Sequence, residues 1–320
     1  MKEIPFSTIL AALTDADRAF PERYVSRFSD LQPADLKALL QAWPQIPLKR
    51  KKTFLTNLVD RFEEDLLLSY EAIGGSILFD EDADVRVMAL KLLDETIDAR
   101  LIPTLIKLLE TDPEAAVRAR AATVLGQFVR MAELGDLPEG RKALLEDVLF
   151  KAASDKQHLV ARAALESLAY SSSAEVDDLI TAAFNRPDPL WQATALFAAG
   201  RSSDNRWQEQ ILLGLLSEDM PVRLAAVQSA GDLELKSARK VLLEMLEDEA
   251  DDDVFQALIW ALSQIGGEDV RTYLEALLAE AEGDEQIEFI EEALANLSFT
   301  EDMEGFDMLA IDPDDVEDLN

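Results

Sequence analysis

Six stretches of this chain repeat one pattern of apolar and small residues spaced four positions apart, which is the spacing of one face of an α-helix. The six triplets are Val85/Ala89/Leu93, Val117/Ala121/Leu125, Val160/Ala164/Leu168, Trp191/Ala195/Ala199, Val222/Ala226/Ala230 and Val254/Leu258/Leu262. Their first residues follow one another at intervals of 32, 43, 31, 31 and 32 residues. Regular periods of this length are typical of stacked helical repeats, in which each unit packs only on its neighbours.

Further apolar helices are expected between these stretches, near residues 101–109, 144–150, 176–184, 211–216, 241–246 and 270–278. Acidic or proline-containing turns, such as those at 111–114 and 217–221, separate the two helices of a pair. Their carboxylates can cap the second helix. A further copy at Phe54/Leu58/Phe62 and a degenerate copy at Ile290/Leu294/Leu297 extend the pattern. The sequence therefore predicts an all-α, right-handed α–α superhelix of about eight helix pairs.

The predicted array covers residues 33–299 and leaves a segment at each end. Residues 1–32 are expected to form an N-terminal helical cap that covers the first repeat. Residues 300–320 contain nine acidic residues and no basic one, which predicts an acidic tail. Apolar side chains lie among these acids, and we expect them to dock on the array or to act as a linear motif for another protein. These tail residues are Phe306, Met308, Leu309 and Ile311.

The chain is strongly acidic, with 30 basic and 64 acidic residues and a net charge of −34. This balance disfavours binding to nucleic acids and to anionic membranes, because both require Lys and Arg. It leaves open a basic protein partner, a nucleic-acid-mimicking role, and a surface that merely keeps the protein soluble. Cysteine is absent, and no signal peptide or apolar span is evident. We therefore expect a cytoplasmic protein.

Residues 112–126, with the sequence DPEAAVRARAATVLG, resemble the second helix of a HEAT-type repeat, in particular the short subclass named after phycobilisome lyases. The V-R-x-x-A core recurs at 85–89 and 222–226. The resemblance implies an interaction scaffold whose second helices line a concave face. Some members of the subclass are bilin lyases or isomerases, but no residues here match that activity.

Arg86, Arg118 and Arg223 occupy one repeat position, whereas three other repeats have Ala161, Gln192 and Phe255 there. We expect the three arginines to form a structural ladder that bonds to the acidic turns of the preceding repeat. The alternative is a basic strip that binds an acidic ligand.

The position six residues into each second helix is mostly polar but carries aromatic residues in two repeats. It holds Lys91, Thr123, Glu166, Phe197, Gln228 and Trp260. Phe197 and Trp260 would flank Gln228 on the concave face, and exposed aromatics anchor many interfaces. These three residues are the predicted partner-binding surface, unless local packing buries both rings.

Residues that could carry chemistry are nearly absent. His158 is the single histidine, and the chain has no cysteine, so neither a Cys/His nor a Ser/His/Asp nucleophile stands out. The acidic run 80–84 is similar to a calcium loop, but Val85 and Lys91 replace the Gly and Glu that such a loop requires. The basic cluster 49–52 would open a helix and needs a compensating acidic neighbour, for which the tail or a partner is a candidate, unless it is simply solvated.

Taken together, these patterns predict a non-catalytic scaffold or adaptor that binds a protein partner, without a cofactor or a metal. Two alternatives remain at this point. One is a bilin lyase or chromophore chaperone, and the other is an acidic mimic that sequesters a basic nucleic-acid-binding protein. The sequence leaves the oligomeric state open.

Overall fold

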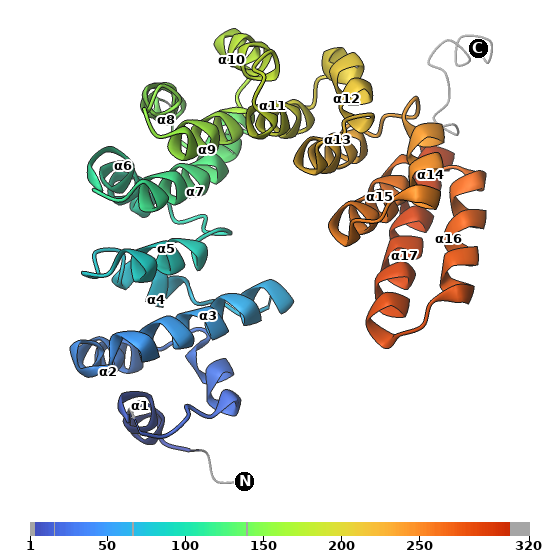
Figure 1. Cartoon of the computed structure of the whole chain (residues 1–320). Helices are drawn as coiled ribbons and strands as arrows, with labels where there is room; N and C mark the ends of the chain where they lie inside the picture. Colours follow the sequence, from blue (N-terminus) through green and yellow to red (C-terminus); the bar gives the residue numbers. More distant parts are fainter. Residues whose placement is uncertain (1–3, 16, 66, 139, 308–320) are drawn as a thin grey trace, which may run out of the picture. The chain divides into compact units, whose positions relative to one another are not determined.

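The computed structural model describes residues 4–15, 17–65, 67–138 and 140–307, and this part of the chain contains helices and no strand (Figure 1). The α-helices are α1 (Phe6–Thr14), α2 (Pro33–Ala42), α3 (Leu48–Glu64), α4 (Glu71–Ser76), α5 (Ala83–Lys91), α6 (Ile102–Thr111), α7 (Ala115–Glu133), α8 (Arg141–Ala152), α9 (His158–Leu168), α10 (Ala174–Phe184), α11 (Pro189–Arg201), α12 (Gln208–Leu215), α13 (Met220–Asp232), α14 (Arg239–Asp248), α15 (Asp252–Ile265), α16 (Glu268–Glu280) and α17 (Asp284–Asp307). Short 3-10 helices precede or follow several of them, as at Glu22–Phe28.

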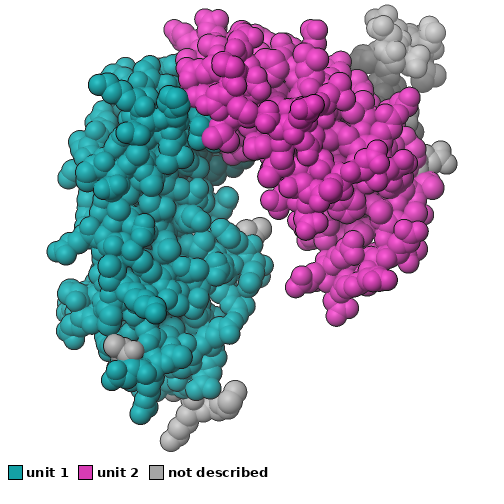
Figure 2. All heavy atoms as spheres, in the orientation of Figure 1, with its two compact units in different colours: residues 1–171 teal, residues 172–320 magenta. Residues whose placement is uncertain are grey.

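The chain divides into two compact units, Met1–Ser171 and Ser172–Asn320, which Figure 2 shows in different colours. The first unit contains the pairs α2/α3, α4/α5, α6/α7 and α8/α9, and the second contains α10/α11, α12/α13, α14/α15 and α16/α17. The structure thus has the eight helix pairs that the repeat predicts.

Within each unit, the second helix of a pair packs on the second helix of the next pair. In the first unit α3 contacts α5, α5 contacts α7 and α7 contacts α9, and in the second unit α11, α13, α15 and α17 follow one another in the same way. All eighteen residues of the six triplets are buried, and the most exposed of them, Trp191, has only 4% of its surface accessible. The repeated pattern is therefore the core stripe of the second helices, whose burial drives the stacking.

Neighbouring second helices approach closely where a glycine meets a serine. A Cβ atom placed on Gly200 of α11 would lie 2.9 Å from the Cα of Ser229 on α13. The buried Ser229 hydroxyl donates to the carbonyl of Leu196 at 2.7 Å across this crossing. Gly126 and Ser167 repeat the arrangement between α7 and α9. A side chain on either glycine would push the helices apart.

The N-terminal segment packs on α3 through aromatic rings. The ring of Phe28 lies 4.7 Å from that of Phe54, and the ring of Phe20 lies 5.9 Å from it, both edge to face. This geometry is favourable for aromatic pairs. Phe20 and Phe28 therefore cover the Phe54 side of α3.

At the other end, the structure differs from the predicted tail boundary at residue 300. Helix α17 continues to Asp307, so residues 300–307 are helical. Thr300 donates to the carbonyl of Ser263 at 3.1 Å, and Arg271 of α16 forms an ion pair with Glu301 at 2.5 Å. These contacts hold the extra turns against the preceding helices, which the acidic composition of the segment did not reveal.

The long interval between the second and third repeats also becomes clear. The extra residues fall at 131–141, where α7 runs on to Glu133 and α8 begins at Arg141. The insertion is therefore divided between a longer helix and a short connection.

Candidate protein-interaction surface

The three arginines of the repeat form a ladder, but it runs in the direction opposite to the one expected. Arg86 donates through Nε and Nη2 to the two carboxylate oxygens of Asp112, both at 2.8 Å, and through Nη1 to the carbonyls of Asp80 and Glu81. Asp112 belongs to the following repeat and not to the preceding one. The carbonyls of the arginine's own turn hold one side of the guanidinium, so its remaining donors face the next turn.

Arg223 and Arg118 repeat this arrangement. Arg223 contacts the carboxylate of Glu249 at 3.1 and 3.2 Å, and Arg118 contacts Asp155 at 3.4 Å. Each also donates to two carbonyls of its own turn. Asp112 additionally accepts a hydrogen bond from the backbone N–H of Glu114, the residue that precedes α7. Each of the three guanidinium groups thus bonds to a carboxylate and two carbonyls of the same chain, which favours a structural role over a strip for an acidic ligand.

Two residues of the basic cluster at 49–52, Lys51 and Lys52, find compensating acids in the next repeat. Lys51 pairs with Asp80 at 2.8 Å, and Lys52 pairs with Asp84 at 2.6 Å and Asp82 at 3.1 Å. Burial alone would raise the pKa of Asp80, but hydrogen bonds from Lys51, the Asp82 N–H and Trp43 hold it below the usual value. The run 80–84 therefore receives ammonium groups of α3 where a calcium loop would receive the ion.

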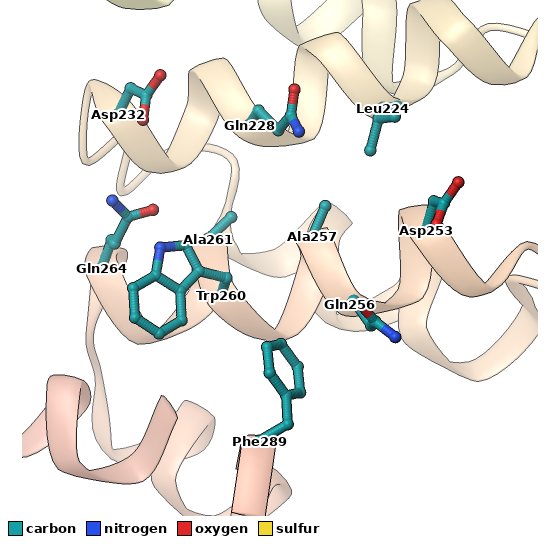
Figure 3. Close-up of a pocket in the computed structure, with 10 residues that line it drawn as sticks. All are labelled: Leu224, Gln228, Asp232, Asp253, Gln256, Ala257, Trp260, Ala261, Gln264 and Phe289. Carbon is teal, nitrogen blue, oxygen red and sulfur yellow. The ribbon is translucent and has the colours of Figure 1, made fainter. Parts of the chain in front are cut away.

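A pocket of about 390 Å³ opens between α13 and α15 (Figure 3). Gln228 of α13 and Trp260 of α15 both line it, so two of the three predicted binding residues come together. Trp260 is 39% exposed, which contradicts burial of its ring by local packing. Phe197 does not line the pocket. It is half-buried, and the guanidinium of Arg201, one helical turn later on α11, stacks on its ring at 4.0 Å.

Residues that the sequence interpretation missed complete the pocket. Leu224 and Gln256 stand one turn before Gln228 and Trp260 on the same helix faces, so helical periodicity alone would have found them. Figure 3 shows Phe289 reaching the pocket from α17, a contact between repeats that no local spacing reveals. The remaining lining residues are Asp232, Asp253, Ala257, Ala261 and Gln264.

Apolar and acidic residues both line the pocket, with Asp232 and Asp253 at its two ends (Figure 3). A second pocket of about 380 Å³ shares Gln256 and Phe289 with it and adds the carboxylates of Asp252 and Glu285. No Lys, Arg or His is among the described residues that line either pocket. Desolvation raises the pKa of Asp232, and the charge of Arg201 opposes this shift. We refer to these two adjoining pockets as the Trp260 groove.

Features that would carry chemistry do not assemble around the groove. Within the described ranges, no group of three or more His, Cys, Asp or Glu side chains is arranged to hold a metal ion. His158 begins α9 in the other unit. Among the predicted tail residues, Phe306 lies in the last turn of α17, whereas Met308, Leu309 and Ile311 fall outside the described residues. No helix of the part that the structure describes is both long and apolar enough to cross a bilayer.

Comparison with known proteins identifies the repeat. The family described as HEAT repeats matches residues 75–146, 176–262 and 209–295, which is more than half of the chain, so the chain belongs to the HEAT-repeat family. The α–α superhelix of HEAT repeats is thus its fold class, as predicted. The narrower likeness to phycobilisome lyases stays a prediction.

Solved structures of low sequence identity resemble the chain. The crystal structure of the Escherichia coli protein YibA is 18% identical, covers 88% of this chain and 98% of its own, and has a TM-score of 0.43. Human deoxyhypusine hydroxylase, solved in complex with glycerol, is 16% identical, covers 81% of this chain and 95% of its own, and has a TM-score of 0.35. The comparison with curated proteins returns no match.

Proposed function

We propose that this chain is a non-catalytic, cytoplasmic scaffold or adaptor that binds a protein partner in the Trp260 groove. HEAT repeats generally mediate protein interactions, and the chain belongs to that family. The observation that carries the proposal is the exposure of Trp260. The other three tryptophans, Trp43, Trp191 and Trp207, are buried, at 7%, 4% and 5% exposure. An exposed tryptophan in a partly apolar pocket is the kind of residue that dominates binding energy at protein interfaces.

The groove has the composition of an interface rather than that of an ordinary surface. Its lining combines the apolar side chains of Trp260, Phe289 and Leu224 with carboxylates at both ends. Aromatic residues are enriched at protein–protein interfaces relative to the rest of the surface. The absence of basic residues from its lining, together with the net charge of −34, supports a basic partner.

The alternatives have less support. No observation favours a bilin lyase or chromophore chaperone. The reading as a nucleic-acid mimic would require acids that are free to bind, whereas those of several turns are engaged by the chain's own cations. We therefore retain the scaffold as the proposal.

A crosslinked pull-down from the native host tests this function. Three baits are compared: the full chain, a Gln228→Ala/Trp260→Ala variant, and a Leu216→Ala control. Leu216 is 73% exposed and follows α12, a first helix, outside the groove. We expect a protein that the full chain and the control recover and that the double variant loses. Equal recovery by all three baits would refute binding in the groove.

A fourth bait separates the tail from the groove. It ends at Asp307, because residues 300–307 belong to α17 and a shorter bait would damage the last helix pair. Loss of the partner with this bait alone would move recognition to residues 308–320.

A further inference from the structure

Several aromatic rings in the described part of the chain lie against cationic side chains of the same chain. In these pairs an arginine or a lysine lies 3.8–5.3 Å from the ring centre. These are Arg23 on Tyr24, Lys51 on Trp43, Lys107 on Phe79, Arg186 on Trp191 and Arg201 on Phe197. Two of these rings, Trp43 and Trp191, belong to buried tryptophans. Exposed Trp260 has no such cation among the described residues.

The surroundings of Trp260 favour a positive charge. Figure 3 shows Asp232 and Asp253 on either side of the indole, at the two ends of the pocket. The adjoining pocket adds Asp252 and Glu285. Within the described ranges these carboxylates form no ion pair, unlike those of the arginine ladder. The nearby cation that acts on Asp232, Arg201, is stacked on Phe197 and does not line the pocket.

Polar groups that could bind a peptide backbone lie beside the indole. Gln228, Gln256 and Gln264 line the pocket, and none of their amides forms a side-chain hydrogen bond with another described residue. Each amide has both a donor and an acceptor, so it can pair with a peptide group of an extended segment. The pocket thus combines an open aromatic face, flanking carboxylates and unused amides.

We propose that the Trp260 groove binds an arginine side chain of a basic, extended segment of the partner, with the guanidinium stacked on the Trp260 ring between Asp232 and Asp253. Arginine fits better than lysine because its planar guanidinium can stack on an indole and donate hydrogen bonds in its plane at the same time. The net charge of −34 would also accelerate the approach of such a segment. This inference rests on the proposed function, since it specifies the chemistry of the partner at the same groove.

The test measures the affinity of a defined peptide for the full chain. The probe is acetyl-Gly-Arg-Gly-Arg-Gly-amide, and its neutral counterpart carries citrulline, which keeps the shape of arginine without the charge. Binding is followed by the tryptophan emission, to which exposed Trp260 responds most directly, and by calorimetry for variants without Trp260. We expect the arginine peptide to bind at least tenfold more tightly than the citrulline peptide. A third peptide, with lysine in place of both arginines, should bind with intermediate affinity.

Variants of the groove locate the binding. Trp260→Ala and Asp232→Asn/Asp253→Asn should each weaken the arginine peptide by about fivefold or more, whereas Trp260→Phe should retain part of the affinity. Asp178→Asn/Glu209→Gln changes the net charge equally at exposed positions on α10 and α12, and should have less than a twofold effect. Thermal unfolding of each variant shows whether it is folded.

Two results would overturn the inference. One is equal affinity for the arginine and citrulline peptides. The other is an equal loss of affinity in the groove variant and in the charge-matched control, which would mean diffuse attraction to an acidic surface. If the Gln228→Ala/Trp260→Ala bait still loses the pull-down partner, either result refutes arginine binding while the proposed function stands. If that bait retains the partner, both the arginine inference and the proposed function are refuted.

Discussion

Replacing Gly200 by alanine should test whether close helix crossings hold the second helices together. In an ordinary helix interior this substitution stabilises by about 1 kcal/mol, because alanine has the higher helix propensity. Here the new methyl group would lie 2.8 Å from the Oγ and 2.9 Å from the Cα of Ser229 on the next helix. Because one of these atoms is backbone, a rotamer change cannot relieve the clash.

The magnitude follows from three contributions. Overpacking of this kind costs about 1–3 kcal/mol. A shift of Ser229 would also weaken its 2.7 Å hydrogen bond to the Leu196 carbonyl, which contributes about 1 kcal/mol. Subtracting the propensity gain of about 1 kcal/mol leaves a net loss of roughly 1–3 kcal/mol.

Two matched substitutions give a graded series. A methyl group on Gly75 of α4 would meet only Leu101, at 3.7 Å, so Gly75→Ala should be neutral or stabilising by up to about 1 kcal/mol. A methyl group on Gly126 would have its nearest contacts at 3.0 Å, so the stability of Gly126→Ala should lie between those of Gly200→Ala and Gly75→Ala. Urea unfolding followed by circular dichroism at 222 nm gives the order. If Gly200→Ala is as stable as the wild type, or if Gly75→Ala is the more damaging, the crossing does not limit stability as we infer.

The arginine ladder and the acidic turns lead to two further predictions. Asp112→Asn leaves the buried Arg86 guanidinium without its counter-charge and should lower the free energy of unfolding by roughly 3 kcal/mol. Asp147→Asn removes an exposed helical ion pair and should lower it by less than about 0.5 kcal/mol. Equal losses in urea unfolding would contradict a role for burial. Arg223 and backbone N–H groups outweigh burial and lower the pKa of Glu249, so its contribution is present above about pH 4.3 and is lost as the pH falls through its folded pKa. The melting temperature of Glu249→Gln should therefore fall less on acidification than that of the wild type, and parallel curves would argue against this linkage.

The repeat and the core could be predicted because both depend on local periodicity. Every member of the six triplets is buried. Residues four positions apart lie on one face of a second helix, and in every repeat this face packs on neighbouring helices. Helix α4, by contrast, has no clear helical pattern in the sequence. It is six residues long with the sequence EAIGGS, and two glycines weaken the helical signal.

The candidate surface was only partly accessible from sequence. Gln228 and Trp260 were found because they share one register position on neighbouring helices. The stacking of Arg201 on Phe197 could have been predicted, because the two residues are four positions apart, the spacing of adjacent side chains on a helix. The part played by Phe289 depends on how α17 packs on α15, which no local pattern encodes.

The direction of the arginine ladder also required the structure. Acidic turns lie both before and after each arginine in the sequence, and composition does not distinguish them. Only the stacking of repeats shows that Nε and Nη2 of Arg86 face Asp112.

Asp112 acts in two places at once, and this has a consequence for how the array assembles. The same carboxylate receives Arg86 from the repeat before it and the backbone N–H of Glu114 at the start of α7. A helix that forms without its predecessor would begin beside a carboxylate that lacks its counter-ion. Formation of one repeat thus favours nucleation of the next, and loss of one repeat loosens the first turn of its successor. Wherever folding begins in this part of the chain, it would then spread from a folded repeat to its neighbour.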